Sequence, residues 1–421
     1  MRRRIAVTTA SCVLALMLCG CTPQVPPEPS PSVTPVFPAA VGLVSSAGLQ
    51  ARGVTIGLLV GPLAGPGSDF RQVVNGAKVA AFRFGLDGLN VSFRVIGDDG
   101  TAPGAWSGMR ALIEENVAGV VVASAGVHLA EALQEATDAG MPVLLPYDYT
   151  DQVSPPVYRT GPDADVVRAA IESTLSASGV SHPVVVRQDD YTITSGWGQE
   201  LSYSGDPVAT GQAVVKAVTD GGADVVVVEA SGDVEASIVS NVQALMGSRQ
   251  LPVVLTPQAL TPAFSAGLGA VADLRGVLMT VGQDTGDTVA LQSGVRGDRT
   301  SAFLQAVRMA SDNATTLNVF GDDTFASVAA YADVASHDAV VALVRAAEKV
   351  ADGDAQSEAA ALTGLSLTDM DGLVGGPLDF SSADALSASS IVTLFASSQA
   401  AGLRPATPDG TIPPIAWVAV E

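Results

Sequence analysis

Short apolar runs rich in valine recur along the chain and alternate with segments of helical periodicity. Two of them, Gly119–Ala123 (GVVVA) and Asp224–Glu229 (DVVVVE), are continuously apolar inside. Strands of this kind are buried on both faces of a sheet, as in parallel sheets covered by helices. The other expected strands are Val54–Val60, Val91–Ile96, Pro142–Leu145, His182–Arg187, Pro252–Thr256 and Gly276–Val281. The expected helices between them are Asp69–Phe84, Ala105–Glu115, Val127–Ala139, Ala164–Ser176, Val234–Met246 and Thr261–Val271.

The repeated strand–helix units predict an α/β fold class, because right-handed crossovers bring successive strands into one parallel sheet. Comparable sets of units precede and follow Thr160, which predicts two doubly wound parallel-sheet lobes instead of one long sheet. The pattern then changes: we expect a connecting loop, two helices and three closing strands. These are the loop Asp284–Arg299, the helices Ser301–Ser311 and Thr324–Lys349, and the strands Gly376–Phe380, Ile391–Phe395 and Ile415–Val420.

Residues 1–20 have the layout of an export signal. Three arginines, Arg2 to Arg4, precede an apolar stretch that is too short for a comfortable membrane span. Leu18-Cys19-Gly20-Cys21 resembles a bacterial lipobox, which implies lipidation of Cys21 and anchoring on the extracytoplasmic face of the cell membrane. The alternative is an ordinary secretory signal with incidental cysteines. Residues 22–40 hold seven prolines, so we expect a stiff extended spacer there.

The composition excludes some partners and some chemistry. The net charge of −22 becomes −25 without the leader, which argues against nucleic acid or anionic lipid as a partner. Solubility explains the acidity, and a polycationic ligand is the alternative. The other two cysteines, Cys12 and Cys19, lie in the leader, so the folded part can hold no disulfide and no cysteine metal site.

The sequence carries no recognisable catalytic or cofactor motif. The glycine-rich turn Gly61–Gly67 (GPLAGPG) has neither the Gly-Lys-Ser/Thr of a nucleotide-binding loop nor the spacing of a dinucleotide site. His128, His182 and His337 are scattered and lie near no acid pair of recognisable spacing. We therefore expect no enzyme activity, no cofactor and no metal.

Aromatic residues gather in one part of the chain. Five of the six tyrosines and Trp197 fall between positions 147 and 203. Several follow predicted strand ends, where open α/β sheets place their ligands, and aromatic walls are typical of small-molecule clefts. The alternative is packing of a hinge between the lobes. The five tyrosines are Tyr147, Tyr149, Tyr158, Tyr191 and Tyr203.

The order and spacing of many segments resemble the branched-chain amino-acid (Leu/Ile/Val) binding proteins of ABC importers, which have the type I periplasmic-binding fold. The likeness extends from about Val54 to Phe380. It implies two lobes joined by three crossovers, near Thr160-Gly161, Val281–Asp284 and Gly376–Leu378. The segments are 54–85, 89–106, 119–126, 141–146, 157–165, 195–201, 222–233, 251–257, 274–280 and 374–380.

In the first lobe the resemblance implies four ligand-binding positions. Phe70 stands where an aromatic residue covers the ligand, and Ser124 where a hydroxyl meets the ligand carboxylate. Tyr147 and Tyr149 stand at the positions where backbone groups and a threonine hydroxyl complete the binding of the ligand carboxylate. Tyr149 is far bulkier than threonine.

In the second lobe the resemblance implies three more. Trp197 is the aromatic residue of that lobe, and Ser231 stands where another aromatic is common. Gln258 replaces the acid that holds the α-amino group. An amide cannot neutralise an ammonium, and an unpaired ion in a closed cleft costs several kcal/mol. The ligand is therefore an amino acid, an amide or another small polar solute, and three acids are candidates to restore the charge: Asp148, Glu229 and Asp233.

The resemblance implies a lipid-anchored, monomeric solute-binding protein that delivers its ligand to an ABC permease by hinge closure. A sensor for a membrane receptor is the alternative, and an enzyme on the same scaffold would need a buried acid–base pair in the cleft. The expected boundaries are 1–20 signal peptide, 21–50 lipidated cysteine and linker, 51–160 and 284–376 N-terminal lobe, 161–283 C-terminal lobe, and 377–421 return to the C-terminal lobe and hinge.

Overall fold

The computed structural model describes residues 40–65, 67–148, 153–189, 191, 193–194, 196–268, 276–351, 355–406 and 415–420. The predictions for the export signal, for lipidation of Cys21 and for nearly all of the proline-rich spacer lie outside these residues. So does the prediction for Tyr149.

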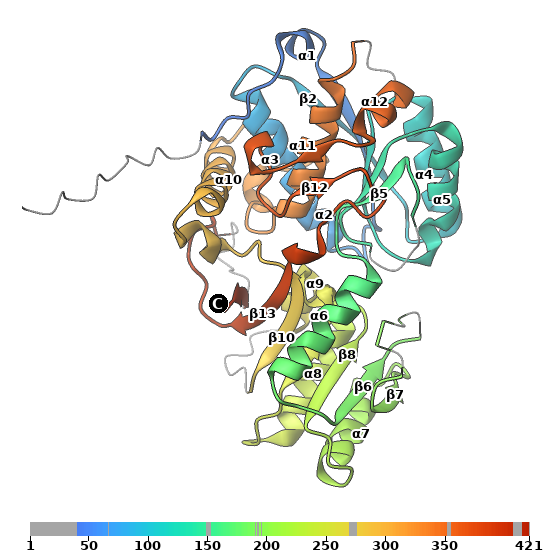
Figure 1. Cartoon of the computed structure of the whole chain (residues 1–421), viewed down its shortest axis with the longest axis vertical. Coiled ribbons are helices and arrows are strands. Elements are labelled where there is room, and N and C mark those ends of the chain that lie inside the picture. The colour runs from blue at the N-terminus through green and yellow to red at the C-terminus, as the bar shows by residue number, and fades with distance from the viewer. Residues whose placement is uncertain are drawn as a thin grey trace, which may run out of the picture. The chain divides into compact units, whose positions relative to one another are not determined.

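The first lobe is built on a five-stranded parallel sheet in the order β2-β1-β3-β4-β5 (Figure 1). Successive side chains of β1 point to opposite faces: Leu58 packs with α3 and α11, whereas Leu59 packs with α4 and α5. Helices cover both faces of the sheet, which is why the inner strands β3 and β4 are buried at every position and are continuously apolar. The elements are β1 Val54–Val60, β2 Val91–Gly97, β3 Val120–Ala123, β4 Val143–Leu145, β5 Val157–Arg159, α3 Gly76–Gly85, α4 Ala102–Glu114, α5 Ala130–Ala139 and α11 Val334–Ala347.

The second lobe is built on a seven-stranded sheet in the order β14-β13-β10-β9-β8-β6-β7. Five strands run parallel to one another. At one edge β13 runs antiparallel to β10, and β14 runs antiparallel to β13. Helices α7, α8 and α9 cover one face and α6 the other. The elements are α6 Ala164–Ala177, β6 Pro183–Arg187, β7 Gln199–Ser202, α7 Pro207–Thr219, β8 Val225–Glu229, α8 Gly232–Met246, β9 Val253–Leu255, α9 Pro262–Leu268, β10 Leu278–Gln283, β13 Ile391–Ser397 and β14 Ala416–Ala419.

The remaining elements complete the first lobe. Helix α10 packs beside α3, and α12 packs beside α11. A short antiparallel pair, β11 and β12, joins the apolar cluster under the five-stranded sheet. These elements are α1 Ala47–Arg52, α2 Phe70–Val73, α10 Val295–Asp312, α12 Ala355–Leu362, β11 Ser366–Leu367 and β12 Leu378–Asp379.

Three expectations from the sequence need correction. Asp284–Arg299 is not wholly a loop, because α10 already begins at Val295. Thr324–Lys349 is not one helix: α11 begins only at Val334, where the Asp333 side chain caps it by accepting the N–H of Ser336. The third passage between the lobes comes later than Gly376–Leu378, because Leu378 first pairs with Leu367 in the first lobe.

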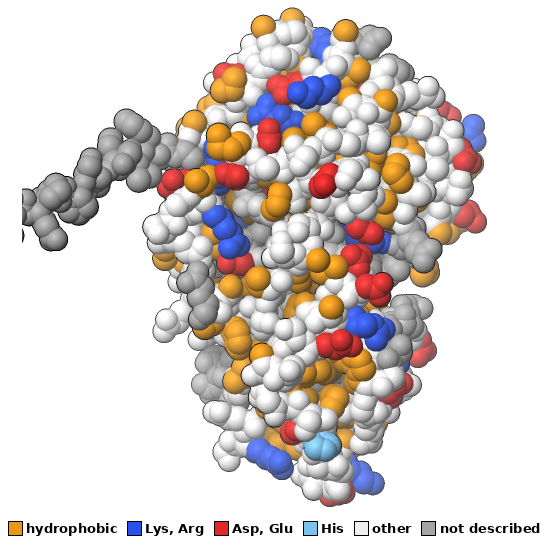
Figure 2. Space-filling model, viewed as in Figure 1, with side chains coloured by type: hydrophobic (Ala, Val, Ile, Leu, Met, Phe, Trp, Pro, Cys, Tyr) orange, Lys and Arg blue, Asp and Glu red, His pale blue; other side chains and the backbone are white. Residues whose placement is uncertain are grey.

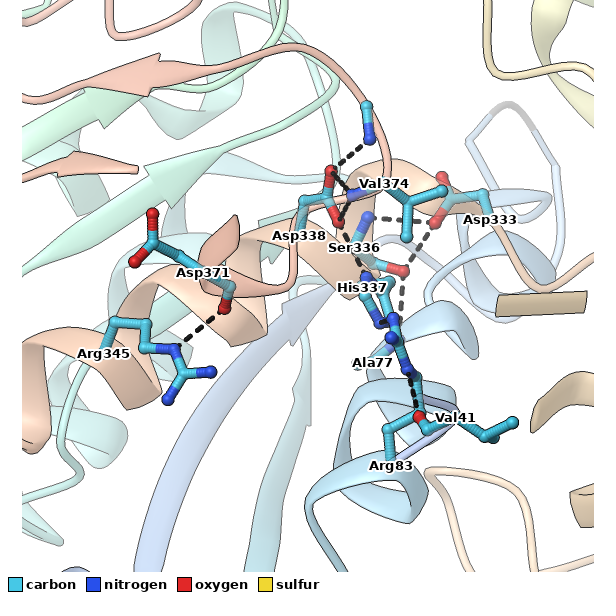
Figure 3. Close-up of polar contacts among 11 residues, drawn as sticks. Val41, Ala77, Arg83, Asp333, Ser336, His337, Asp338, Arg345, Asp371 and Val374 are labelled. Carbon is cyan, nitrogen blue, oxygen red and sulfur yellow. Dashed lines mark hydrogen bonds and ion pairs between the residues drawn. The ribbon is translucent and has the colours of Figure 1, made fainter. Parts of the chain in front are cut away.

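A buried polar network ties α3 to α11 inside the first lobe (Figure 3). The Arg83 side chain is fully buried, and it donates to the carbonyl of Val41 at 2.8 Å and to His337 Nε2 at 3.0 Å. Since a guanidinium has only donors, Nε2 must accept, and Nδ1–H then donates to Asp338 at 2.7 Å. Asp338 in turn accepts the N–H groups of Val374 and Gly375. The network therefore fixes the loop before β12.

We expect His337 to make stability depend on pH. Burial, more than the neighbouring Arg83, lowers the pKa of His337 below 6.5, so the unfolded chain binds this proton more readily than the folded chain. Stability from this group is complete above pH 6.5 and is lost as the pH falls below it. Urea unfolding of wild type and His337→Gln at several pH values tests this. The difference in unfolding free energy between the two should shrink as the pH falls, and a constant difference would contradict the prediction.

A segment of the C-terminal region leaves the second lobe and contacts the first. After β13, the chain passes α10, where Arg308 donates to the carbonyl of Leu403 at 2.7 Å. Arg404 Nε donates to both oxygens of Asp287, at 2.8 and 3.1 Å, and its Nη1 donates to the carbonyl of Ala332. The chain then returns to the second sheet as β14. Arg404 thus holds the residue that precedes Asp333.

Candidate functional site

Two adjoining cavities lie between the lobes, at the carboxyl ends of strands from both sheets. Residues that follow β4 line the first cavity, of about 160 Å³, and residues that follow β3 and β8 line the second, of about 220 Å³. Phe70, Gln258 and Thr261 line both. This is the edge at which open parallel sheets bind ligands, because there the loops diverge. The first cavity also borders Gly161 and Gln283, which lie where the chain passes between the lobes.

Two aromatic rings line the first cavity. Phe70 begins α2 and is 5% exposed, and Tyr147 follows β4. Their ring centroids are 5.1 Å apart and the planes are tilted by 42°. The hydroxyl of Tyr147 donates to Asp333 Oδ2 at 2.8 Å. Burial, followed by the charge of Asp333, raises the pKa of Tyr147 well above its usual value, so this hydroxyl stays protonated.

Asp333 brings a carboxylate into the same cavity from the start of α11. Its Oδ1 accepts the N–H of Ser336 at 2.9 Å and the hydroxyl of Ser336 at 2.5 Å (Figure 3). Burial nevertheless raises the pKa of Asp333 to about 6, against the lowering effect of these hydrogen bonds and of Arg404. The three donors therefore do not fully compensate the loss of water around this charge.

Ser124, after β3, belongs to a hydrogen-bonded cluster with His128 and Asp98 that the sequence did not predict. Its hydroxyl lies 3.3 Å from His128 Nε2, and the same nitrogen lies 2.9 Å from Asp98 Oδ2. A catalytic relay would use the two ring nitrogens separately, so this arrangement is not one. Burial opposes the charge of Asp98, but hydrogen bonds from His128, Ser124 and the Gly100 N–H lower its pKa below the usual value. The only signal in the sequence is a histidine four residues after a strand-end serine.

The second lobe contributes polar groups to the second cavity. Ser231 donates through its hydroxyl to Asp233 Oδ1 at 2.7 Å, and both residues line this cavity with Gln258. Glu229, another candidate acid, is instead held by Thr194, whose N–H donates at 3.0 Å, and does not line either cavity. Asp148 lines the first cavity. Asp233 and Asp148 are thus the candidate acids that the structure brings to the cleft.

The remaining aromatic residues are distributed between the cleft and the interior. Tyr191 lines the second cavity. Trp197 packs on the apolar cluster beside α6, with its ring centroid 5.8 Å from the Arg168 guanidinium, and lines neither cavity. Tyr158 is fully buried against Phe380, and Tyr203 packs against the second lobe's core.

The lobes touch at one end of the second cavity. Asp69, just before α2, accepts the N–H of Ala263 in α9 at 3.3 Å. Burial raises the pKa of Asp69, despite this hydrogen bond and one from Thr261. Both cavities are therefore bounded by both lobes.

Comparison with known proteins places this architecture in a class. The sequence matches no protein-family model and no curated protein. An extracellular ligand-binding receptor from Rhodopseudomonas palustris has a similar structure, with a TM-score of 0.60, 15% identity and coverage of 88% of this chain and 99% of that one. LivJ from Streptococcus pneumoniae, solved with isoleucine, has a TM-score of 0.59 and 18% identity, with coverage of 87% of this chain and 100% of that one. An R. palustris solute-binding protein solved with benzoate has a TM-score of 0.60 and 19% identity, with coverage of 88% of this chain and 98% of that one.

At these identities the likeness establishes the fold. The chain has the two-lobed α/β fold of the type I periplasmic binding proteins, as the sequence predicted. Within the described residues, no helix is long and apolar enough to cross a membrane. The same residues contain no group of three or more His, Cys, Asp or Glu side chains placed to hold a metal ion.

Proposed function

We propose that the protein is an extracytoplasmic solute-binding protein, which closes on a small polar ligand and presents it to an ABC importer. The observation that carries this proposal is the pair of cavities between the lobes, with walls from both. A ligand bound there contacts both lobes only in the closed form, so its binding energy favours closure. Solved proteins of similar fold hold isoleucine, leucine or benzoate.

The proposal includes the anchor and the partner. A lipid on Cys21 would hold the protein at the outer face of the membrane, beside its permease. Basic side chains are scattered over the face shown in Figure 2 and do not gather into a patch, which agrees with a partner other than nucleic acid. We propose a monomer, as the resemblance implies.

The proposed ligand contacts begin with those expected from the sequence that line the cavities: Phe70, Ser124, Tyr147, Ser231 and Gln258. His128 and Asp333 join them. Tyr149 and Trp197 stay in the proposal on the resemblance alone.

We propose binding and not catalysis, although Tyr147 and Asp333 form a partly buried, hydrogen-bonded acid pair in the cleft. The raised pKa of Tyr147 makes it a poor base at neutral pH. The Ser124 hydroxyl shares one nitrogen of His128 with Asp98, so it lacks the separate base and orienting acid of an activated nucleophile.

Thermal shift and small-angle scattering across a panel of amino acids, amides, amines, carboxylates and polyols test the function. A true ligand should raise the melting temperature and reduce the radius of gyration. Phe70→Ala should weaken that ligand about tenfold, since an aromatic wall of the cavity is lost. Leu63→Ala is the matched control, because Leu63 is 82% exposed and lines neither cavity. Absence of compaction with every compound would exclude the proposal.

A further inference from the structure

We infer that the ligand carries a positively charged organic group, an amine or a quaternary ammonium, which lies in the first cavity against the rings of Phe70 and Tyr147 and the carboxylate of Asp333. This inference rests on the proposed function and names the ligand class. Three observations support it: the absence of lysine and arginine among the described residues that line the cavities, the neutral donors around Asp333, and the paired rings of Phe70 and Tyr147.

Among the described residues that line the two cavities, the carboxylates have no lysine or arginine beside them. Asp148 and Asp333 line the first cavity, and Asp69 and Asp233 line the second. None of the described residues that line either cavity is a lysine or an arginine. His128 is the only basic side chain there, and it already contacts the buried carboxylate of Asp98. An anionic ligand would find no lysine or arginine among these residues to balance its charge, and an unbalanced charge is costly in a closed site.

The charge of Asp333 is only partly compensated from within the protein. The three groups that donate hydrogen bonds to Asp333 are all neutral: the hydroxyl of Tyr147 and the N–H and hydroxyl of Ser336. Arg404, whose charge lowers the pKa of Asp333, directs its hydrogen bonds to Asp287 and to the carbonyl of Ala332. The raised pKa of Asp333 agrees with this shortage. An ammonium in the cavity would supply the missing charge.

The two rings suit the same ligand. Phe70 and Tyr147 lie side by side on the cavity wall, next to the carboxylate that Tyr147 contacts. Aromatic rings attract cations through their quadrupole, and cages of rings beside a carboxylate recognise quaternary ammonium groups. The other walls of this cavity include Val73, Val334 and Leu260, which match methyl or methylene groups better than a hydrated anion.

Asp333→Asn is the decisive variant. The amide keeps an oxygen that accepts from Ser336, and its NH2 group replaces Oδ2 and can donate to the Tyr147 hydroxyl, which reverses that hydrogen bond. Asparagine caps a helix as well as aspartate does, so the local fold should persist. The probes are choline and its uncharged isostere 3,3-dimethylbutan-1-ol, together with n-alkylamines and the amides of equal length. Glu131→Gln is the control, because it removes the same charge from an exposed position on α5.

The expected result is that one or more cations bind the wild type and compact it, that the neutral isostere binds at least tenfold more weakly, and that Asp333→Asn weakens the cation at least tenfold. Glu131→Gln should leave its affinity within twofold. Equal affinity of Asp333→Asn and wild type for the cation would overturn the role of Asp333. Compaction by neutral or anionic compounds alone would overturn the cation inference and leave solute binding standing. No compaction by any compound of the wider panel would overturn both.

Discussion

Replacing Arg83 by methionine is expected to lower the free energy of unfolding by about 3–5 kcal/mol, because it removes one member of a buried charged network and leaves the others in place. Arg83 is fully buried, and burial lowers its pKa to about 10, so it remains a cation at neutral pH. Without it, the carbonyl of Val41 and Nε2 of His337 lose their donor, and Asp338 keeps a negative charge in the core. Urea unfolding followed by circular dichroism measures the loss.

Two further variants test whether the loss of stability comes from the buried network and not simply from the removal of a charge. Arg94→Met breaks an ion pair with Glu115 whose side chains are 52% and 44% exposed, so its cost should stay below about 1 kcal/mol. Asp338→Asn combined with Arg83→Met should cost less than the sum of the two single changes, because the partners act together. A cost for Arg83→Met as small as that of Arg94→Met would show that the network adds nothing to stability.

The fold could be predicted because it depends on local patterns. The runs around Val120–Ala123 and Val225–Glu229 are buried at every position, so their continuous apolar character was a reliable sign of a sheet covered on both faces. The missed helix α7 had a local signal as well. Asp206 caps it and Pro207 occupies its first turn, and an aspartate followed by proline is typical of a helix start. Asp333 is likewise the N-cap of α11, so a helix start at this aspartate would have replaced the overlong predicted helix Thr324–Lys349.

Residues of the candidate site could be predicted to line the cleft only where the fold itself determines their position. Ser124, Tyr147, Ser231 and Gln258 follow strand ends, and that edge of each sheet faces the cleft. Asp333 does not follow a strand. It meets Tyr147 across 186 positions of sequence, because α11 packs on α3 and directs its first residues toward the cleft. Neither composition nor spacing predicts this contact between Tyr147 and Asp333. The negative charge of Asp333 is the main reason to infer a cationic ligand.

The packing of α3 against α11 gives a second strong prediction, for Gly76→Ala. Gly76 begins α3, and a Cβ there would lie 1.9 Å from the carbonyl oxygen of Asp333 and 2.6 Å from Ser336 Oγ. The first of these atoms belongs to the backbone, so α11 must move, and we expect a loss of about 3 kcal/mol in unfolding free energy. Because the displaced residues include Asp333, the folded variant should also bind its ligand at least tenfold more weakly.

Gly85→Ala, at the other end of the same helix, is the matched control. A Cβ at Gly85 would meet nothing within 4 Å, and alanine is the better helix former, so this variant should be as stable as wild type or more stable by about 0.5–1 kcal/mol. Chemical unfolding and calorimetric titration of both variants check the pair. If Gly76→Ala matches Gly85→Ala in stability and affinity, then α3 and α11 do not approach as closely as described, and the position of Asp333 in the cleft loses its structural basis.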